Sequence, residues 1–167
     1  MKKLIVAALV AAACSLSPAQ EVLVSGSVER ISLLPPGTAE CPKDCPQMFT
    51  PLPDGATRVC ISNYCGCQVT DIKVDKVLLG ADPGAILHVK SRLGEWCKPS
   101  FPISTALLLV QVKDGAARWS DIEARNGAET FDAMMFNMIG RVPAASLKSD
   151  QGKVTLDELR KALSGQR

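Results

Sequence analysis

The strongest constraint on the fold of this chain is a proline-rich segment that holds most of its cysteines. Residues 34–58 contain six prolines, and five of the seven cysteines lie between residues 41 and 67. Proline has no backbone N–H and restricts the preceding residue, so this segment is incompatible with a regular helix or a central strand. Irregular segments of this length are uncommon in compact domains unless disulfides hold them in place or they serve a function. We therefore expect a loop that is held by its cysteines.

The N-terminus has the three-part pattern of a secretory signal peptide. Lys2 and Lys3 form a positive region, ten apolar residues follow at 4–13, and the small residues Ser17 and Ala19 precede a cleavage point before Gln20. Ten helical residues span about 15 Å, half of a bilayer core of roughly 30 Å, so the run predicts export and no membrane span. Lipidation at Cys14 is the alternative. We expect a periplasmic or secreted protein, or a lipoprotein.

Six cysteines remain after the leader, and an even number in an exported chain predicts three disulfides. They are Cys41, Cys45, Cys60, Cys65, Cys67 and Cys97. The sequence does not choose among the possible pairings. In an extended chain Cys65 and Cys67 project to the same side, so each reaches a separate partner more easily than it reaches the other.

A rival interpretation of the same cysteines is a copper-binding or thiol-redox site. The run Cys41-Pro-Lys-Asp-Cys45-Pro resembles the CPxxCP copper motif of the Sco family of cytochrome oxidase assembly proteins. In that family the motif follows an apolar strand, whereas residues 35–40 here read as a loop. The first prediction is therefore structural disulfides, with a site at Cys41 and Cys45 as the alternative.

Net charge excludes two classes of partner. The first 19 residues hold two lysines and no acid, and the rest of the chain carries equal numbers of basic and acidic side chains. A nucleic-acid-binding protein needs a basic field to meet phosphates, and docking on an anionic membrane needs one as well. We expect neither partner.

Alternating hydrophobicity predicts a mainly β domain over residues 20–142. Gly26 in the first strand indicates a bulge or bend, and Asp114-Gly115 is a hairpin signal. A short further strand is expected at 58–62. The five principal strands are expected at residues 21–31, 68–79, 85–91, 105–112 and 117–124. Residues 105–112 are almost wholly apolar, as in a strand buried on both faces. Five such strands suit a small Greek-key barrel of the OB type.

One or two helices are expected near the C-terminus, the last of them in a helical tail over residues 143–167. Residues 128–139 show an apolar stripe at helical spacing, expected to pack against a sheet or barrel end. The stripe comprises Phe131, Met134, Met135, Met138 and Ile139. Thr155 and Glu158 form a capping box that opens a helix reaching Leu163. Ser120 and Glu123 fit a second capping box, which is a competing interpretation of residues 117–124.

Four runs of residues between positions 20 and 125 match a known pattern, namely Asp71–Gly80, Ile86–Val89, Trp96-Cys97 and Leu107–Val110. Through these runs, residues 20–125 resemble the netrin-like modules, a family that includes the tissue inhibitors of metalloproteinases. The resemblance implies an OB-like barrel that serves as a rigid binding scaffold, with Cys97 in a disulfide. The inhibitors carry a Cys-x-Cys at the mature N-terminus, whereas Cys65-Gly-Cys67 is internal here, so the inhibitory wedge does not carry over.

No residue pattern predicts catalysis. His88 is the single histidine, no nucleophile elbow accompanies it, and acidic pairs such as Asp71 and Asp75 lie beside lysines on a polar strand face. We expect a non-enzymatic binding module without cofactor or metal, whose partner is an unidentified protein. The stapled loop is the candidate contact surface, because a rigid loop loses little entropy on binding. Its apolar anchors are Met48, Phe49, Leu52 and Tyr64.

Overall fold

The computed structural model describes most of the chain after the expected leader. The described residues are 21–43, 45, 47, 49–60, 65–103, 106–147 and 153–165. The predicted signal peptide, its cleavage point and Cys14 lie outside them. Met48 and Tyr64 of the predicted contact surface also lie outside them.

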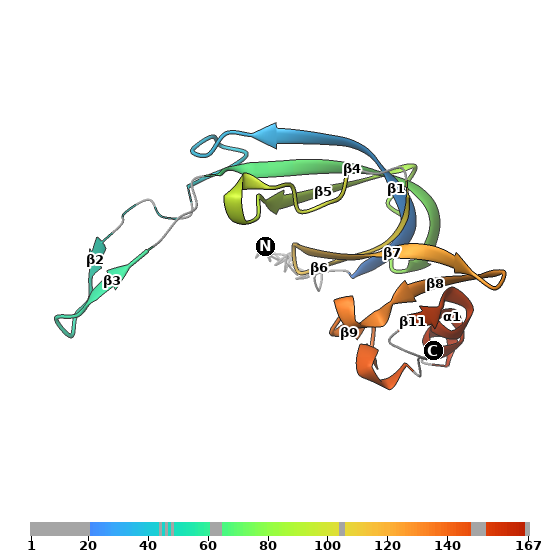
Figure 1. Ribbon diagram of the computed structural model, residues 1–167. Helices are drawn as coiled ribbons and strands as arrows, with labels where there is room; N and C mark the ends of the chain where they lie inside the picture. Colours follow the sequence, from blue (N-terminus) through green and yellow to red (C-terminus); the bar gives the residue numbers. More distant parts are fainter. Residues whose placement is uncertain are drawn as a thin grey trace, which may run out of the picture.

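The body of the protein is one antiparallel sheet that curls into a half-barrel (Figure 1). The strands run in the order β11-β8-β7-β6-β1-β4-β5. Their bounds are Val22–Leu34 for β1, Cys67–Leu79 for β4, Ile86–Arg92 for β5, Leu107–Lys113 for β6, Ala116–Arg125 for β7, Ala128–Asp132 for β8 and Lys153–Thr155 for β11. The prediction of a mainly β fold is confirmed. The prediction of five strands is wrong, because β8 and β11 extend the sheet beyond β7.

Glycine lets the long first strand bend. The register between β1 and β4 shifts at Gly26, and a Cβ at that position would meet the backbone oxygen of Lys73. The bend expected at Gly26 is therefore present, and it brings β1 against both β4 and β6. The edge strand β5 is not hydrogen-bonded to β7 in this sheet, so the described sheet is an open curl and not a closed barrel.

Two apolar clusters cover the two faces of the sheet. The cluster on the concave side joins β1, β4, β5 and β6 and contains Val24, Ile72, Leu87, Val89, Phe101, Leu108 and Val110. Phe101 comes from the loop after β5 and stacks on Trp119, whose indole nitrogen donates to the Ser100 carbonyl. The cluster on the other side joins Leu23 and Leu109 to the C-terminal elements. Because Leu108 faces one cluster and Leu109 the other, β6 is buried on both faces, as predicted.

The helix predicted over residues 128–139 is wrong. This segment forms β8, a short 3-10 turn at Ala133–Met135 and the two-residue strand β9 (Met138–Ile139). Asn126 and Gly127 both adopt positive φ, of 51° and 79°, and turn the chain back so that β8 pairs with β7. Asn-Gly is the strongest short hairpin signal, and it outweighs the helical spacing that follows it.

The apolar residues of the predicted stripe do not lie on one common face in the structure. Phe131 and Ile139 are fully buried, whereas Met134 is 70% exposed and Met135 is 47% exposed. Phe131 instead packs edge-on against Phe136. The expectation that the methionines pack against the sheet is therefore wrong for these two side chains.

Other local predictions agree with the structure. Asp114 and Gly115 form the hairpin before β7, so the strand interpretation of residues 117–124 is correct and the helix beginning at Ser120 is not formed. The short strand expected at 58–62 is β3 (Thr57–Val59), and residues 61 and 62 lie outside the described part.

The C-terminal region adds a strand and a helix to the body. After β9 the chain forms β10 (Val142–Pro143), a 3-10 turn at Ala144–Ser146, β11 and helix α1 (Leu156–Ser164). The capping box of Thr155 and Glu158 is present. Leu156 and Leu159 are buried in the cluster that also contains Phe131. Within the described residues, no helix combines the length and hydrophobicity needed to cross a bilayer.

Candidate functional site

Three disulfides tie the cysteine-rich segment together. They join Cys41 to Cys67, Cys45 to Cys60 and Cys65 to Cys97. The prediction of three disulfides is confirmed, and Cys65 and Cys67 reach separate partners as expected. Cys41 and Cys67 are almost completely buried, with 0% and 3% of their surface exposed.

The two cysteines of the CPxxCP motif are not bonded to each other. Each forms its disulfide with a cysteine from later in the chain. The Arg92 guanidinium closes over this region, donating to the Pro42 carbonyl at 2.7 Å and lying 3.5 Å from the Cys41 sulfur. Among the described residues, no group of three or more His, Cys, Asp or Glu side chains is arranged to hold a metal ion.

A two-stranded hairpin projects from the end of the sheet where these disulfides lie (Figure 1). It consists of β2 (Phe49–Pro51) and β3 (Thr57–Val59), and we call residues 49–59 the arm. Its turn is closed by hydrogen bonds from the Leu52 N–H to the Ala56 carbonyl and from the Gly55 N–H to the Leu52 carbonyl. The Asp54 carboxylate also accepts from the Ala56 N–H. An isolated hairpin is marginally stable in water. The Cys45–Cys60 disulfide lies at the base of the arm and compensates for that weakness.

The arm exposes large apolar side chains. Phe49 and Val59 are directly opposite in the hairpin register, and they are 62% and 55% exposed. Leu52 at the turn is partly buried. Of the four predicted anchors, the structure thus places Phe49 on the surface of the arm and Leu52 at its tip.

Sequence reasoning missed the aromatic residue that is the most exposed among those the structure describes. Trp96 lies in the 3-10 turn Glu95–Cys97 after β5 and is 88% exposed. Trp96 and Cys97 both have φ near 58°, a left-handed conformation that is uncommon for bulky residues and costs roughly 1–3 kcal/mol. The Cys65–Cys97 disulfide holds this turn. Only the exposure of the side chain, which no sequence pattern reports, distinguishes Trp96 from a core tryptophan.

A second cluster of polar groups lies across three neighbouring strands. Arg30, Asp71 and His88 are paired in register on β1, β4 and β5. The Asp71 carboxylate accepts from Arg30 Nε at 2.8 Å, and its other oxygen lies 2.7 Å from His88 Nδ1. Asp71 comes from the strand face that the sequence analysis described as polar, but its side chain is only 8% exposed.

The hydrogen bonds in this row of three residues, Arg30, Asp71 and His88, shift the pKa of Asp71. Hydrogen bonds from His88 and then Arg30 lower the pKa of Asp71 below its ordinary value of 3.8, against a smaller opposing effect of desolvation. His88 and Arg30 are themselves about two-thirds exposed. The row reads as a cross-strand clamp at the surface of the sheet.

Acid titration tests the clamp. The lowered pKa means that ionised Asp71 stabilises the folded state at pH values above 3.8, and that this contribution is lost as the pH falls through the lower folded-state pKa. We expect Asp71→Asn to be less stable than the wild type at pH 7, with the difference shrinking towards pH 2. Urea unfolding across that range measures it. Glu129→Gln, whose carboxylate lies 3.8 Å from Lys76, is the control. An Asp71→Asn deficit that is the same at pH 7 and pH 2 would contradict the clamp.

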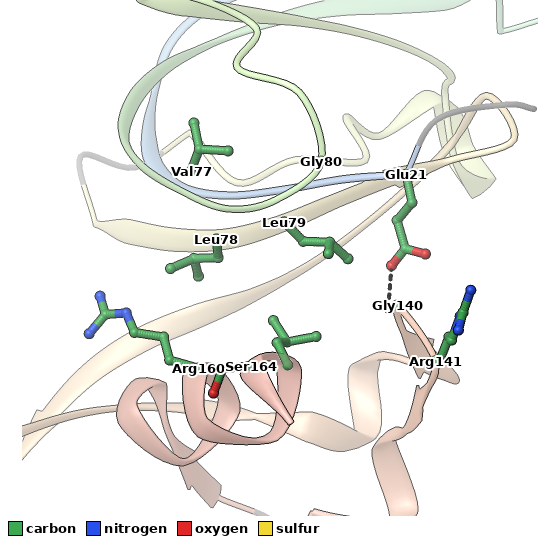
Figure 2. Close-up of a pocket in the computed structure, with 10 residues that line it drawn as sticks. Glu21, Val77, Leu78, Leu79, Gly80, Gly140, Arg141, Arg160 and Ser164 are labelled. Atoms are coloured by element: carbon green, nitrogen blue, oxygen red, sulfur yellow. Dashed lines mark hydrogen bonds between the residues drawn. The ribbon is translucent and has the colours of Figure 1, made fainter. Parts of the chain in front are cut away.

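A cleft lies at the opposite end of β4, between the sheet and helix α1 (Figure 2). Its volume is about 750 Å³. Apolar and polar side chains share its wall, with Glu21 and Gly140 on one side and the helix on the other. The lining residues are Glu21, Val77, Leu78, Leu79, Gly80, Gly140, Arg141, Arg160, Leu163 and Ser164.

Glu21 connects the start of β1 to the C-terminal elements. Its carboxylate accepts from Gln111 Nε2 at 2.6 Å and from the Gly140 N–H at 2.7 Å, and it pairs with Lys113 at 3.0 Å. Burial alone would raise the pKa of Glu21, but the hydrogen bonds from Gly140, Lys113 and Gln111 outweigh it and lower the pKa. Glu21 is therefore a structural carboxylate whose two oxygens are already hydrogen-bonded or ion-paired within the protein.

Comparison with family models, with curated proteins and with solved structures finds no match to this chain. The functional inference therefore rests on the geometry of the arm, the disulfides and the cleft. The arm combines exposed apolar side chains with a covalently closed base, and it lies within the stapled loop that the sequence analysis selected.

Proposed function

We propose that this chain is exported and acts as a non-enzymatic interaction module that binds a protein partner through the arm. The three disulfides support export, because thiols are kept reduced in the cytosol and disulfides persist in oxidising compartments. The apolar run at residues 4–13 and its basic start support the same destination.

The strand arrangement supports the netrin-like scaffold as part of this proposal. Five of the strands lie in the order β5-β4-β1-β6-β7, with β1 in the centre between β4 and β6. This is an order in which a five-stranded Greek-key barrel of the OB type places its strands. In the proposal, the half-barrel is a rigid platform and the arm is the variable contact element that it carries.

The observation that carries the proposal is the exposed pair of Phe49 and Val59 on a projecting hairpin. Large aromatic residues that insert into a partner's pocket dominate binding energy at protein interfaces. Here the disulfide at the base of the arm removes part of the entropy cost of ordering it, which favours binding. Thr50 and Arg58 form the next pair in the register and lie on the opposite face of the same arm, so they provide a matched control.

Site-specific photo-crosslinking in the cells that produce the protein tests the proposal. We expect a photo-reactive phenylalanine at position 49 to give one discrete adduct with another protein, and the same residue at position 58 to give little or none. Substituting Phe49→Ser should then weaken binding of that purified partner by about 30-fold or more, the effect of losing a hot-spot side chain. Arg58→Ser should change the affinity by less than about threefold.

Two results would count against the arm as the contact surface. Equal adducts at positions 49 and 58 would indicate random collision. An adduct formed only with a second copy of this chain would indicate self-association in place of partner binding. Because the arm lies outside both apolar clusters, the Phe49→Ser variant is expected to keep the folded body, which circular dichroism checks.

A further inference from the structure

The cleft beside helix α1 owes its apolar wall to an irregularity in β4. Leu23 pairs with Leu79, but the next residue, Val24, pairs with Val77, so Leu78 is an extra residue in the strand. A bulge of this kind re-aims a side chain, and bulges are frequent next to functional sites. In Figure 2 both Leu78 and Leu79 extend from β4 towards the helix, whereas Val77 points away. With Leu163 of α1, they form a partly buried apolar wall.

The backbone at the top of this wall is closely packed. Gly80 has φ of 87°, and a Cβ there would collide with the backbone oxygen of Glu21. Only glycine therefore allows β4 to end this close to the start of β1. The volume of about 750 Å³ lies within the range of small-molecule pockets, roughly 300–1,000 Å³.

Charge at the cleft is positive on balance. Arg160 and Arg141 lie at its two ends (Figure 2). The single carboxylate in the lining, that of Glu21, is already bound by Lys113 and two further donors. The Arg160 guanidinium pairs at 2.7 Å with Asp157, whose side chain is 88% exposed. An exposed pair of this kind contributes little stability, so a ligand can share or replace it at small cost.

We propose that the cleft binds a single-chain amphiphile with a carboxylate head group, that is, a long-chain fatty acid. The alkyl chain lies along Leu78, Leu79 and Leu163. The carboxylate binds the Arg160 guanidinium, whose fork of N–H donors matches two carboxylate oxygens. An apolar wall that ends at a guanidinium favours such a ligand over a neutral lipid, which lacks the charge, and over a short acid, which lacks the chain.

Titration of the disulfide-intact full chain with dodecanoate, below its micelle-forming concentration, tests the proposal. We expect saturable shifts in the ¹H–¹⁵N spectrum at the amides of Gly80 and Ser164, with none at the arm. Butyrate should give no saturable shift, because it lacks the chain. Dodecanol should bind about tenfold or more weakly than dodecanoate, because it lacks the charge. Dodecyltrimethylammonium should not compete.

Variants identify the head-group contact. Arg160→Gln should weaken dodecanoate binding about tenfold or more and leave dodecanol binding unchanged. Arg125→Gln is the matched control, since Arg125 is also exposed and paired with an acid, Glu123, but does not line the cleft. Equal affinity for dodecanoate and dodecanol in the wild type would overturn the proposal, and so would shifts that map away from the cleft. The ligand series uses the unmodified chain, so it decides the question even if a variant is unstable.

Discussion

Replacing Phe131 by alanine is expected to lower the free energy of unfolding by about 3–5 kcal/mol, the range for an aromatic side chain removed from a packed core. Phe131 is fully buried on β8, opposite Ile122 of β7 and Val154 of β11. It also packs edge-on against Phe136. Truncation leaves a cavity where β8, β11 and the C-terminal helix meet. Urea unfolding followed by circular dichroism measures the loss.

The matched control for this variant is Met134→Ala. Met134 lies three residues further along the chain, on the face that a helix over residues 128–139 would share with Phe131. In the structure it is 70% exposed, so its truncation should change stability by less than about 0.5 kcal/mol. Similar losses for the two variants would indicate a common buried stripe and would contradict the β8 strand.

Removing the Cys41–Cys67 disulfide with the double variant Cys41→Ala/Cys67→Ala is expected to cost about 2–5 kcal/mol, the usual range for a native disulfide in a small domain. Both cysteines are buried, and Cys67 is the first residue of β4, paired with Leu34 at the end of β1 and with Arg92 at the end of β5. The bond therefore joins the cysteine-rich loop directly to three strands of the sheet. Urea unfolding without reductant measures the effect.

The variant Cys45→Ala/Cys60→Ala is the comparison for the buried disulfide. It removes the disulfide at the base of the arm, which joins two cysteines 15 residues apart in the sequence. The strands β2 and β3 make their main contacts with each other and not with the sheet. We expect the unfolding of the sheet to change by less than about 1 kcal/mol, while amide exchange in the arm becomes fast, because local stability is not uniform across a structure. An equal loss of global stability in both double variants would show that the arm unfolds together with the body.

Much of the fold follows from local patterns that need no tertiary context. The strands β1, β4, β5, β6 and β7 lie within a few residues of the predicted ranges, because period-two alternation reports directly on a half-buried strand. The capped helix at Thr155 is equally local. The error at residues 128–139 was avoidable, since Asn126-Gly127 is itself a hairpin signal and the five apolar residues after it mimic a helical stripe by chance.

The candidate sites depended on register, which sequence patterns do not give. Arg30, Asp71 and His88 meet because of the register of the strands. Only residues 67–73 of β4 pair with β5, whereas the rest of β4 pairs with β1 alone. Centring the hairpin on the Gly80–Gly84 turn would place a different residue opposite Asp71. A shift of one residue would also reverse the face of every side chain, so no reading of either strand alone finds this row.

Residue composition and spacing were sufficient to establish a β-rich chain with three disulfides and a capped C-terminal helix. The strands and the capped helix depend on neighbours a few residues apart, and the number of disulfides follows from an even count of cysteines behind an export signal. The partners of the individual cysteines, the exposure of Trp96 and the two methionines, and the cleft under Leu78 arise only when distant segments pack together. A long-range contact is selected by the total free energy of all the contacts that form with it, and that sum is not contained in any short stretch of the chain.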